Sequence, residues 1–310
     1  MSYYKYTTLN TTKLIIENKS LRWSSPLKFN DIEECQFVPY TKESYDEAIK
    51  KYLEIITKIA KGVKVDYDYN KFKPITQMLI GMIQLSINQG TFDPSNLAEQ
   101  SLNTISNPEA DYRDYINNGL IKIFRILCVT NKYNNKLMWA HYGDQHYGCA
   151  IEFSELYLNK PFNLKEGFVE YHENLNPKTN SLELLLYGET QEIRDVMIQD
   201  VIFSKKADWK YEEEYRLLFS ENFGEIKAET DFETKKTTIT ASKQTDKLFT
   251  DVPISKDFIK SISFGTRVKD EEITNIQNQL NDNNIDCELY KMILNEGSLE
   301  RIKLTKKDYS

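Results

Sequence analysis

The spacing of apolar residues changes along this chain, and that change constrains its fold more than any other sequence feature. From about residue 42 to residue 126, apolar residues recur every three or four positions, which is typical of helices that bury one face. The second half instead carries short segments rich in β-branched and aromatic residues, among them ILCVTN, GCAIEFS, YRLLFS and IKSISFG. Helical patterns around 181–199 and 269–282 interrupt these segments.

The start of the chain has the order strand, helix, strand. SYYKYT and LRWSS are β-prone, and TTKLIIENKS between them has a helical pattern with Thr11 or Thr12 as its N-cap. Strand-rich and helix-rich regions that are separated along a chain are typical of α+β folds. We therefore predict a mixed, mostly antiparallel β core in a single domain over residues 1–310, with a large helical insertion at about 42–126.

Charge and composition limit where the protein acts. A net charge of −7 at pH 7 gives no overall attraction to nucleic acid or to an anionic membrane. No apolar run approaches the roughly 20 residues of a membrane span, and MSYYKYTTLN lacks the order of a signal peptide. The four cysteines form no CxxC pair. We expect a cytoplasmic protein with reduced thiols and no membrane partner.

The segment MWAHYGDQHYGCAIEF, residues 138–153, holds two of the three histidines of the chain. His141 and His146 are five residues apart, a spacing that does not place two imidazoles on one helical face for a metal. The simplest interpretation is a helix-to-strand corner packed by Trp139 and Tyr142, with Gly148 allowing a close turn. Because packing does not explain why the histidines cluster, a role for His141, Tyr142 and His146 in contacting a substrate stays open.

LRWSSPLKFND, residues 21–31, combines hydroxyl groups with residues that favour turns. Ser24 and Ser25 precede Pro26, and Asn30 lies in a turn-forming pair. A turn capped by a hydroxyl group is the favoured interpretation. The alternative is that Ser24, Ser25 and Asn30 face a cleft beside the first strand.

ADWKYEEEYRLLFS, residues 207–220, contains three consecutive glutamates. If the segment is a strand, alternation places Glu212, Glu214 and Arg216 on one face and Glu213 on the other, with the core residues. A charge run most often forms a solvated face, and this is the favoured interpretation. The alternative is the floor of a cleft, because the preceding Trp209 and Tyr211 are costly on an open surface and suggest a lined edge.

These segments together resemble a bacterial domain-of-unknown-function family, number 2971. YKY, LRWSSPLKFND, MWAHYGDQHYGCAIEF and WKYEEEYRLLF follow its pattern closely, and the closing IKSISFG fits as well. Gly143 stands where the family usually has Ala, and Ile32 stands where a Pro often follows the Asn-Asp pair. The resemblance covers nearly the whole chain, although the helical insertion is longer than typical.

A weaker resemblance, at the level of the fold, is to ADP-ribosyltransferases that modify nucleic acids. These enzymes also begin strand–helix–strand, and a late strand presents one glutamate to the nicotinamide ribose of NAD. The resemblance implies Glu214 as the catalytic carboxylate, with Glu212 second, and NAD as co-substrate. It also implies partners for the nucleotide: Lys5, Arg22 or Arg216 for the pyrophosphate and Ser24 or Ser25 for the ribose. Lys5 and Tyr6 occupy the first strand, where many of those enzymes carry His.

Three functions follow as alternatives. The first is NAD-dependent transfer of ADP-ribose by a toxin or phage-defence effector that acts on nucleic acid or protein, with a nucleotide as partner. The second is a non-catalytic ligand-binding or sensor module of a defence system. The third is a metal-assisted hydrolase that uses His141 and His146, although we expect no metal. No phosphate-binding loop, GxGxxG, GxSxG or HExxH motif is present.

Overall fold

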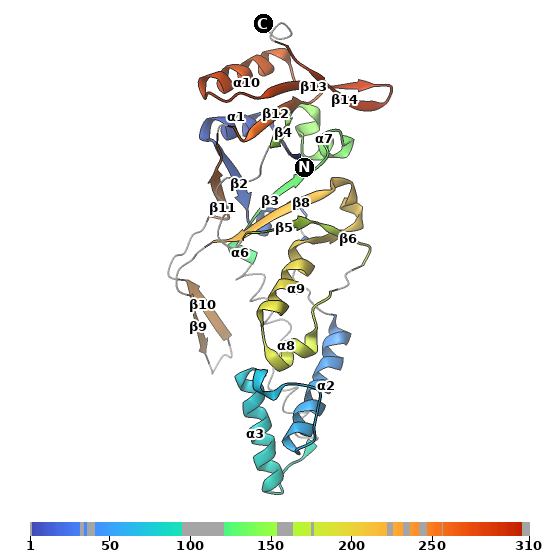
Figure 1. Ribbon diagram of the computed structural model, residues 1–310, viewed down its shortest axis with the longest axis vertical. Helices are drawn as coiled ribbons and strands as arrows, with labels where there is room; N and C mark the ends of the chain where they lie inside the picture. The colour runs from blue at the N-terminus through green and yellow to red at the C-terminus, as the bar shows by residue number, and fades with distance from the viewer. Residues whose placement is uncertain are drawn as a thin grey trace. The chain divides into compact units, whose positions relative to one another are not determined.

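The computed structural model describes residues 2–31, 34–35, 41–94, 121–153, 164–174, 177–221, 226–231, 236–241, 247–255 and 257–305. The chain divides into two compact units, shown in Figure 1 with colours that follow the residue number. The first unit comprises Met1–Glu34, Gly119–Glu173 and Lys205–Ser310, and the second comprises Cys35–Asn118 and Asn174–Ser204.

A mixed sheet, ten-stranded among the described residues, forms the first unit. Eight strands follow one another in the spatial order β11 (Phe249–Pro253), β2 (Ser20–Ser24), β3 (Phe124–Thr130), β1 (Tyr3–Thr7), β4 (Cys149–Phe153), β12 (Ile259–Phe264), β13 (Glu288–Asn295) and β14 (Ser298–Lys303). β8 (Glu214–Ser220) pairs with the whole of β3 and also with β5 (Lys165–Phe168). Only β12 and β13 pair in parallel among the described strands of this sheet, which confirms the predicted α+β fold with its mostly antiparallel core.

The first three elements are a strand, a helix and a strand, as predicted: β1, α1 (Leu9–Asn18) and β2. The helix begins earlier than the sequence suggested, because Thr8 is its N-cap and accepts a hydrogen bond from the amide of Thr11 at 3.1 Å. Thr12 is already inside the first turn, where its hydroxyl donates to the carbonyl of Thr8. The predicted N-cap at Thr11 or Thr12 is therefore wrong.

The main hydrophobic core lies between the sheet and two helices, α1 and α10 (Asp270–Asp282). Ile16 of α1 and Ile276 of α10 pack there with Leu127 of β3 and Leu217 of β8. Since side chains alternate along a strand, burying Leu217 in this core turns Glu214 and Arg216 to the opposite face of β8. This alternation confirms the predicted common face of Glu214 and Arg216.

The second unit is helical among its described residues. Its helices are α2 (Lys42–Ala60), α3 (Pro74–Asn88), α8 (Ser181–Tyr187) and α9 (Gln191–Ile202), with the short η2 (Tyr69–Lys71). Ile56 of α2, Ile80 and Ile83 of α3 and Leu186 of α8 share one core. The segment 174–204 joins this unit although it lies far from the predicted insertion in sequence. The predicted single domain with its insertion stays a prediction.

The predicted insertion ends too late, because β3 begins at Phe124, before residue 126. Residues 95–120 of that insertion lie outside the described residues. The remaining elements are η1 (Pro26–Lys28), α6 (Ile121–Ile123), α7 (Lys136–His141), η4 (Asp144–His146), β6 (Glu170–His172), β7 (Ser204–Lys206), η5 (Ala207–Glu212), β9 (Ile226–Asp231) and β10 (Lys236–Ala241). The four cysteines form no disulfide with one another. Within the described ranges, no helix has the length and apolar character needed to cross a membrane.

Candidate functional site

The three consecutive glutamates do not continue one strand. Glu212 ends the 3₁₀ helix η5, Glu213 adopts a left-handed conformation with φ 44°, and β8 begins only at Glu214. This break in the backbone turns Glu212 and Glu214 inward, where they are 3% and 6% exposed. Glu213 instead points outward, with its carboxylate 3.7 Å from the ammonium of Lys132.

Two expectations about this segment are therefore wrong. The favoured solvated face is buried at Glu212, Glu214 and Arg216, and Arg216 is 0% exposed. Glu213, predicted to share the face of the core residues, is exposed. Glu213 leaves the core face because its left-handed backbone interrupts the two-residue alternation. The other carboxylates are buried, and not solvated, because Lys205 and Arg216 pair with them inside the fold.

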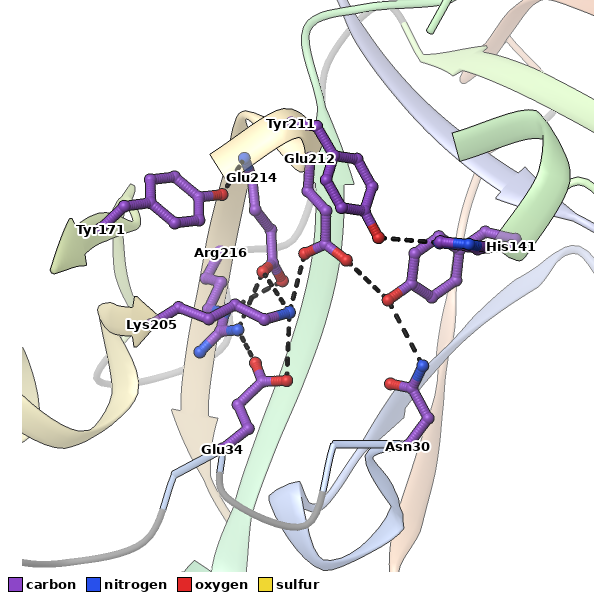
Figure 2. A network of polar contacts seen from close by, with 10 residues as sticks. Asn30, Glu34, His141, Tyr171, Lys205, Tyr211, Glu212, Glu214 and Arg216 are labelled. Carbon is purple, nitrogen blue, oxygen red and sulfur yellow. Dashed lines mark hydrogen bonds and ion pairs between the residues drawn. The ribbon is translucent and has the colours of Figure 1, made fainter. Parts of the chain in front are cut away.

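Five buried charged residues form what we call the charge network, shown in Figure 2: Glu34, Lys205, Glu212, Glu214 and Arg216. Arg216 binds Glu214 through two parallel hydrogen bonds, Nε to Oε1 at 2.9 Å and Nη2 to Oε2 at 2.8 Å. Its Nη2 also donates to Glu34. Lys205 Nζ lies 2.7 Å from Glu212 Oε2, 3.1 Å from Glu34 Oε2 and 3.7 Å from Glu214 Oε2. Such pairing is what allows charges to be buried.

The charge network contains three carboxylates and two cations, so it is short of one positive charge when every group is ionised. Burial raises the pKa of the Glu214 carboxyl to about 7; the Lys205 ammonium opposes this rise, and the Glu212 carboxylate adds to it. The pKa of Lys205 is raised, since Glu214 and Glu212 together outweigh the effect of its burial. The network is therefore able to exchange a proton near neutral pH.

A layer of aromatic side chains lies next to the charge network. Tyr142 donates a hydrogen bond of 2.7 Å to Oε1 of Glu212, and it accepts one of 3.4 Å from Asn30. Nδ1 of His141 lies 2.8 Å from the hydroxyl of Tyr211, as Figure 2 shows. Burial, with the nearby carboxylate of Glu212, raises the pKa of Tyr211 to about 12. Of the predicted binding residues, the structure thus brings Asn30, His141, Tyr142 and Arg216 together with both glutamates.

The corner at 138–153 is packed as predicted. Trp139 is fully buried, and its Nε1 donates to the carbonyl of Tyr133 at 2.8 Å. A Cβ atom at Gly148 would lie 2.2 Å from the carbonyl oxygen of Thr7, which confirms the close approach expected there. His146 stacks on Trp139 with 6.1 Å between the ring centres, whereas His141 bonds Tyr211. The two histidines therefore have separate partners.

Within the described ranges, no three His, Cys, Asp or Glu side chains group in a way that could hold a metal ion.

The other predicted binding residues form their hydrogen bonds outside the charge network, although the charge of Lys5 opposes the burial that raises the pKa of Glu214. Tyr6 donates to the carbonyl of Lys132, and Lys5 donates to the carbonyl of Cys128 at 3.3 Å. Arg22 is exposed and binds Asp251 through two hydrogen bonds of 2.9 and 3.0 Å.

The serine pair forms the predicted turn. Ser25 caps η1 by accepting from the amide of Leu27, and its hydroxyl donates to the carbonyl of Ile121, which confirms the hydroxyl-capped turn. Ser24 lies in β2, where it pairs with Ile126 of β3. A contact between either serine and a ribose stays a prediction.

Sequence reasoning missed three residues of the site: Glu34, Tyr171 and Lys205. Tyr211, expected only to line an edge beside the glutamates, lies against His141. Tyr171 accepts a hydrogen bond of 3.0 Å from the amide of Glu214, so it holds the first residue of β8 in place. The sequence contained one usable signal, because carboxylates beside a core strand need buried cations, and the lysines of SKKADWKY directly precede the glutamates. Nothing in the sequence marks Glu34 as the second partner of Arg216.

The comparison with protein families connects this geometry to the sequence motifs. The family described as "Protein of unknown function (DUF2971)" matches residues 138–217. The matched segment contains His141 and Tyr142 at its start and Lys205, Tyr211, Glu212, Glu214 and Arg216 near its end. The ends of the matched segment therefore meet in space at the candidate site.

Two further comparisons gave no match. No curated protein is similar to this chain. No solved structure is similar to it either.

Proposed function

We propose that this protein is an enzyme that transfers ADP-ribose from NAD to a nucleic acid or protein, as a bacterial toxin or phage-defence effector, with Glu214 at the reaction centre. The observation that supports this best is the strand register. Glu214 of β8 pairs with Thr130 of β3, and Thr130 pairs with Tyr4 of β1. The glutamate of the late strand is therefore level with the first strand of the fold, which supports the layout that the resemblance to ADP-ribosyltransferases implies.

The chemistry of the reaction suits a carboxyl group with a pKa near neutrality. The bond between the ribose C1′ and the nicotinamide nitrogen breaks, and nicotinamide leaves with the electron pair. Positive charge develops on the ribose, where the Glu214 carboxylate stabilises it. The acceptor then bonds to C1′ and gives its proton to that carboxylate. The pKa of about 7 at Glu214 leaves a substantial fraction ionised for the first step at neutral pH.

The proposed reaction relies on the carboxylates. None of the three cations predicted to bind the pyrophosphate of NAD is given that role, because each already has a partner in the chain. Arg22 already binds Asp251, Lys5 donates to the carbonyl of Cys128, and Arg216 is held between Glu34 and Glu214. Glu212 is the second carboxylate. It pairs with Lys205, which also lies near Glu214, and it accepts a hydrogen bond from Tyr142.

The test is incubation of the protein with labelled NAD in the presence of cell extract, single-stranded and double-stranded DNA, or RNA. We expect label transfer by the native chain, at least a hundredfold loss in Glu214→Gln and no loss in Glu213→Gln. Glu213 is the matched control because it is the adjacent glutamate and points into solvent. Absence of both transfer and NAD consumption in every mixture, or an unchanged rate in Glu214→Gln, would contradict the proposal.

A second candidate function is a non-catalytic ligand-binding or sensor module. It is favoured by the completeness of the charge network. Both carboxylate oxygens of Glu212 and both of Glu214 receive a donor from the same chain, as in a network that serves stability. Mass spectrometry of protein purified without additives separates the candidates. A retained ligand that is never turned over supports the sensor, whereas consumption of NAD supports the transferase.

A further inference from the structure

Four aromatic rings follow one another at the edge of the charge network: Trp209, Tyr211, His141 and Tyr142. The ring centres of Trp209 and Tyr211 are 6.1 Å apart, those of Tyr211 and His141 are 5.7 Å apart, and those of His141 and Tyr142 are 6.4 Å apart. His141 is exposed, and the other three side chains are half-buried. We call this group the aromatic edge. Aromatic rings that are held in place and still accessible are suited to binding another ring.

Trp209 has one face turned inward. The ammonium of Lys205 lies 4.7 Å from the centre of the Trp209 ring, and the Lys205 side chain is only 4% exposed. Because a buried cation lies over one face of a half-buried indole, the accessible part of the ring belongs to the opposite face. The ion pairs of Lys205 with Glu212 and Glu34 hold the ammonium in place against the indole.

The geometry of the aromatic edge also selects the chemistry of a ligand. A flat indole face with a second ring beside it favours a planar, polarisable partner that can stack on it. The purine ring is the common biological ligand of that kind, and stacking on aromatic side chains is how proteins hold unpaired bases.

We propose that the outer face of Trp209, with Tyr211 beside it, is a stacking site for a nucleobase. The exposed Lys210, which follows Trp209 in the chain, is the neighbouring cation for a phosphate. The base comes either from a free nucleotide or from a single-stranded nucleic acid, and both present the same planar ring. The site is one of binding, so it stands whether or not the chain turns NAD over.

Tryptophan fluorescence reports selectively on this site. The chain has three tryptophans, and Trp23 and Trp139 are only 1% and 0% exposed, so a ligand in solution can stack on Trp209 alone. Native protein is titrated with AMP, with a short single-stranded oligo-adenylate and with ribose 5-phosphate. We expect saturable quenching by one or both adenine ligands and none by ribose 5-phosphate. Quenching by AMP alone identifies a nucleotide site, whereas stronger, salt-dependent quenching by the oligomer identifies a strand site.

Substitutions then locate the contact with a labelled oligo-adenylate as the probe. Trp209→Ala should weaken binding by about tenfold, the loss expected for one stacked base. Trp209→Phe, which keeps a ring, should stay within about threefold of the native affinity. Tyr69→Ala removes an exposed aromatic ring from the helical unit and should leave binding unchanged. Circular dichroism checks the fold of each variant.

The proposal is overturned if no adenine ligand quenches the fluorescence, if ribose 5-phosphate quenches equally, or if Trp209→Phe loses as much affinity as Trp209→Ala. Binding by Glu214→Gln separates this inference from the proposed transferase. A Glu214→Gln variant that binds AMP or the oligomer but transfers no ADP-ribose supports both. Binding by a native chain that never consumes NAD supports the base site alone.

Discussion

The hydroxyl of Tyr142 donates a hydrogen bond of 2.7 Å to Oε1 of Glu212, a residue 70 positions further along the chain. It connects the two ends of the segment that the family matches, and it satisfies an oxygen of a glutamate that is 3% exposed. A buried carboxylate oxygen that lacks a hydrogen-bond donor lowers the stability of the fold, because nothing replaces the hydrogen bonds that it makes to water in the unfolded chain. The stability of the site therefore depends on a side chain outside the charge network.

Replacing Tyr142 by Phe should lower the free energy of unfolding by about 1–3 kcal/mol, since it leaves a buried carboxylate oxygen unsatisfied. Urea denaturation measures the change. The matched control is Tyr290→Phe, because Tyr290 also donates to a glutamate, but its acceptor Glu288 is exposed to water. Its loss should cost less than about 0.5 kcal/mol. Equal losses in the two variants would show that burial of Glu212 is not what matters.

Replacing Arg216 by Met should destabilise the chain by about 3–5 kcal/mol, because two buried carboxylates lose their shared guanidinium. Adding Glu34→Gln to that variant should restore part of the loss, since it removes one unpaired charge. Arg22→Met is the surface control. Arg22 and Asp251 have side chains that are 58% and 42% exposed, and their pair should contribute less than about 1 kcal/mol. A double variant no more stable than Arg216→Met would contradict the coupling.

Glu214 should make stability fall as pH rises from about 4.5 to about 7. Its pKa of about 7 in the folded chain lies above the 4.5 of an exposed glutamate, so the folded state binds more protons in this window. The shift corresponds to at most about 3 kcal/mol across the window. Denaturation of the native chain and of Glu214→Gln at several pH values gives the two slopes. The glutamine variant should lose this slope.

Glu152 provides the opposite pH dependence as a control. Burial disfavours its charged form, but hydrogen bonds from Ser261, Lys260 and Arg301 hold its pKa at about 2. Because this pKa is depressed, its contribution is present above about pH 4.5 and is lost as pH falls toward 2. Glu152→Gln should therefore reduce the pH dependence of the free energy of unfolding only below about pH 4.5. Glu214→Gln should reduce it only between about pH 4.5 and 7. The same change in both variants would contradict the assignment of the two pH ranges to Glu152 and Glu214.

Helix α3 provides a test of which apolar residues stabilise the helical unit. Ile80 is 3% exposed and packs in its core, whereas Met82, two residues later, is 55% exposed. Ile80→Ala should lower the free energy of unfolding by about 2–5 kcal/mol because it leaves a cavity. Met82→Ala should change it by less than about 0.5 kcal/mol. Amide hydrogen exchange in α3 measures both, and strong loss of protection in Met82→Ala would show that this face is covered.

The local sequence pattern predicted much of the fold. Apolar alternation in YRLLFS placed Glu214 and Arg216 on one face of a strand, and the apolar residues that recur every three or four positions after residue 42 predicted a helix, which the structure confirms as α2. Such features depend on residues a few positions apart, and periodicity records them directly. One of the two errors in the glutamate run came from Glu213, whose left-handed backbone interrupts the alternation.

What the sequence determined by itself was the α+β class, the strand that ends in LLFS and the segments that carry polar residues beside apolar ones. Only the tertiary structure decided that those polar residues are buried together. Arg216 meets Glu34 across 182 positions, and Tyr142 meets Glu212 across 70. The physical reason is that a charged side chain is buried only where a partner from elsewhere in the chain offsets its lost hydration. Local periodicity carries no information about which distant residue supplies that partner.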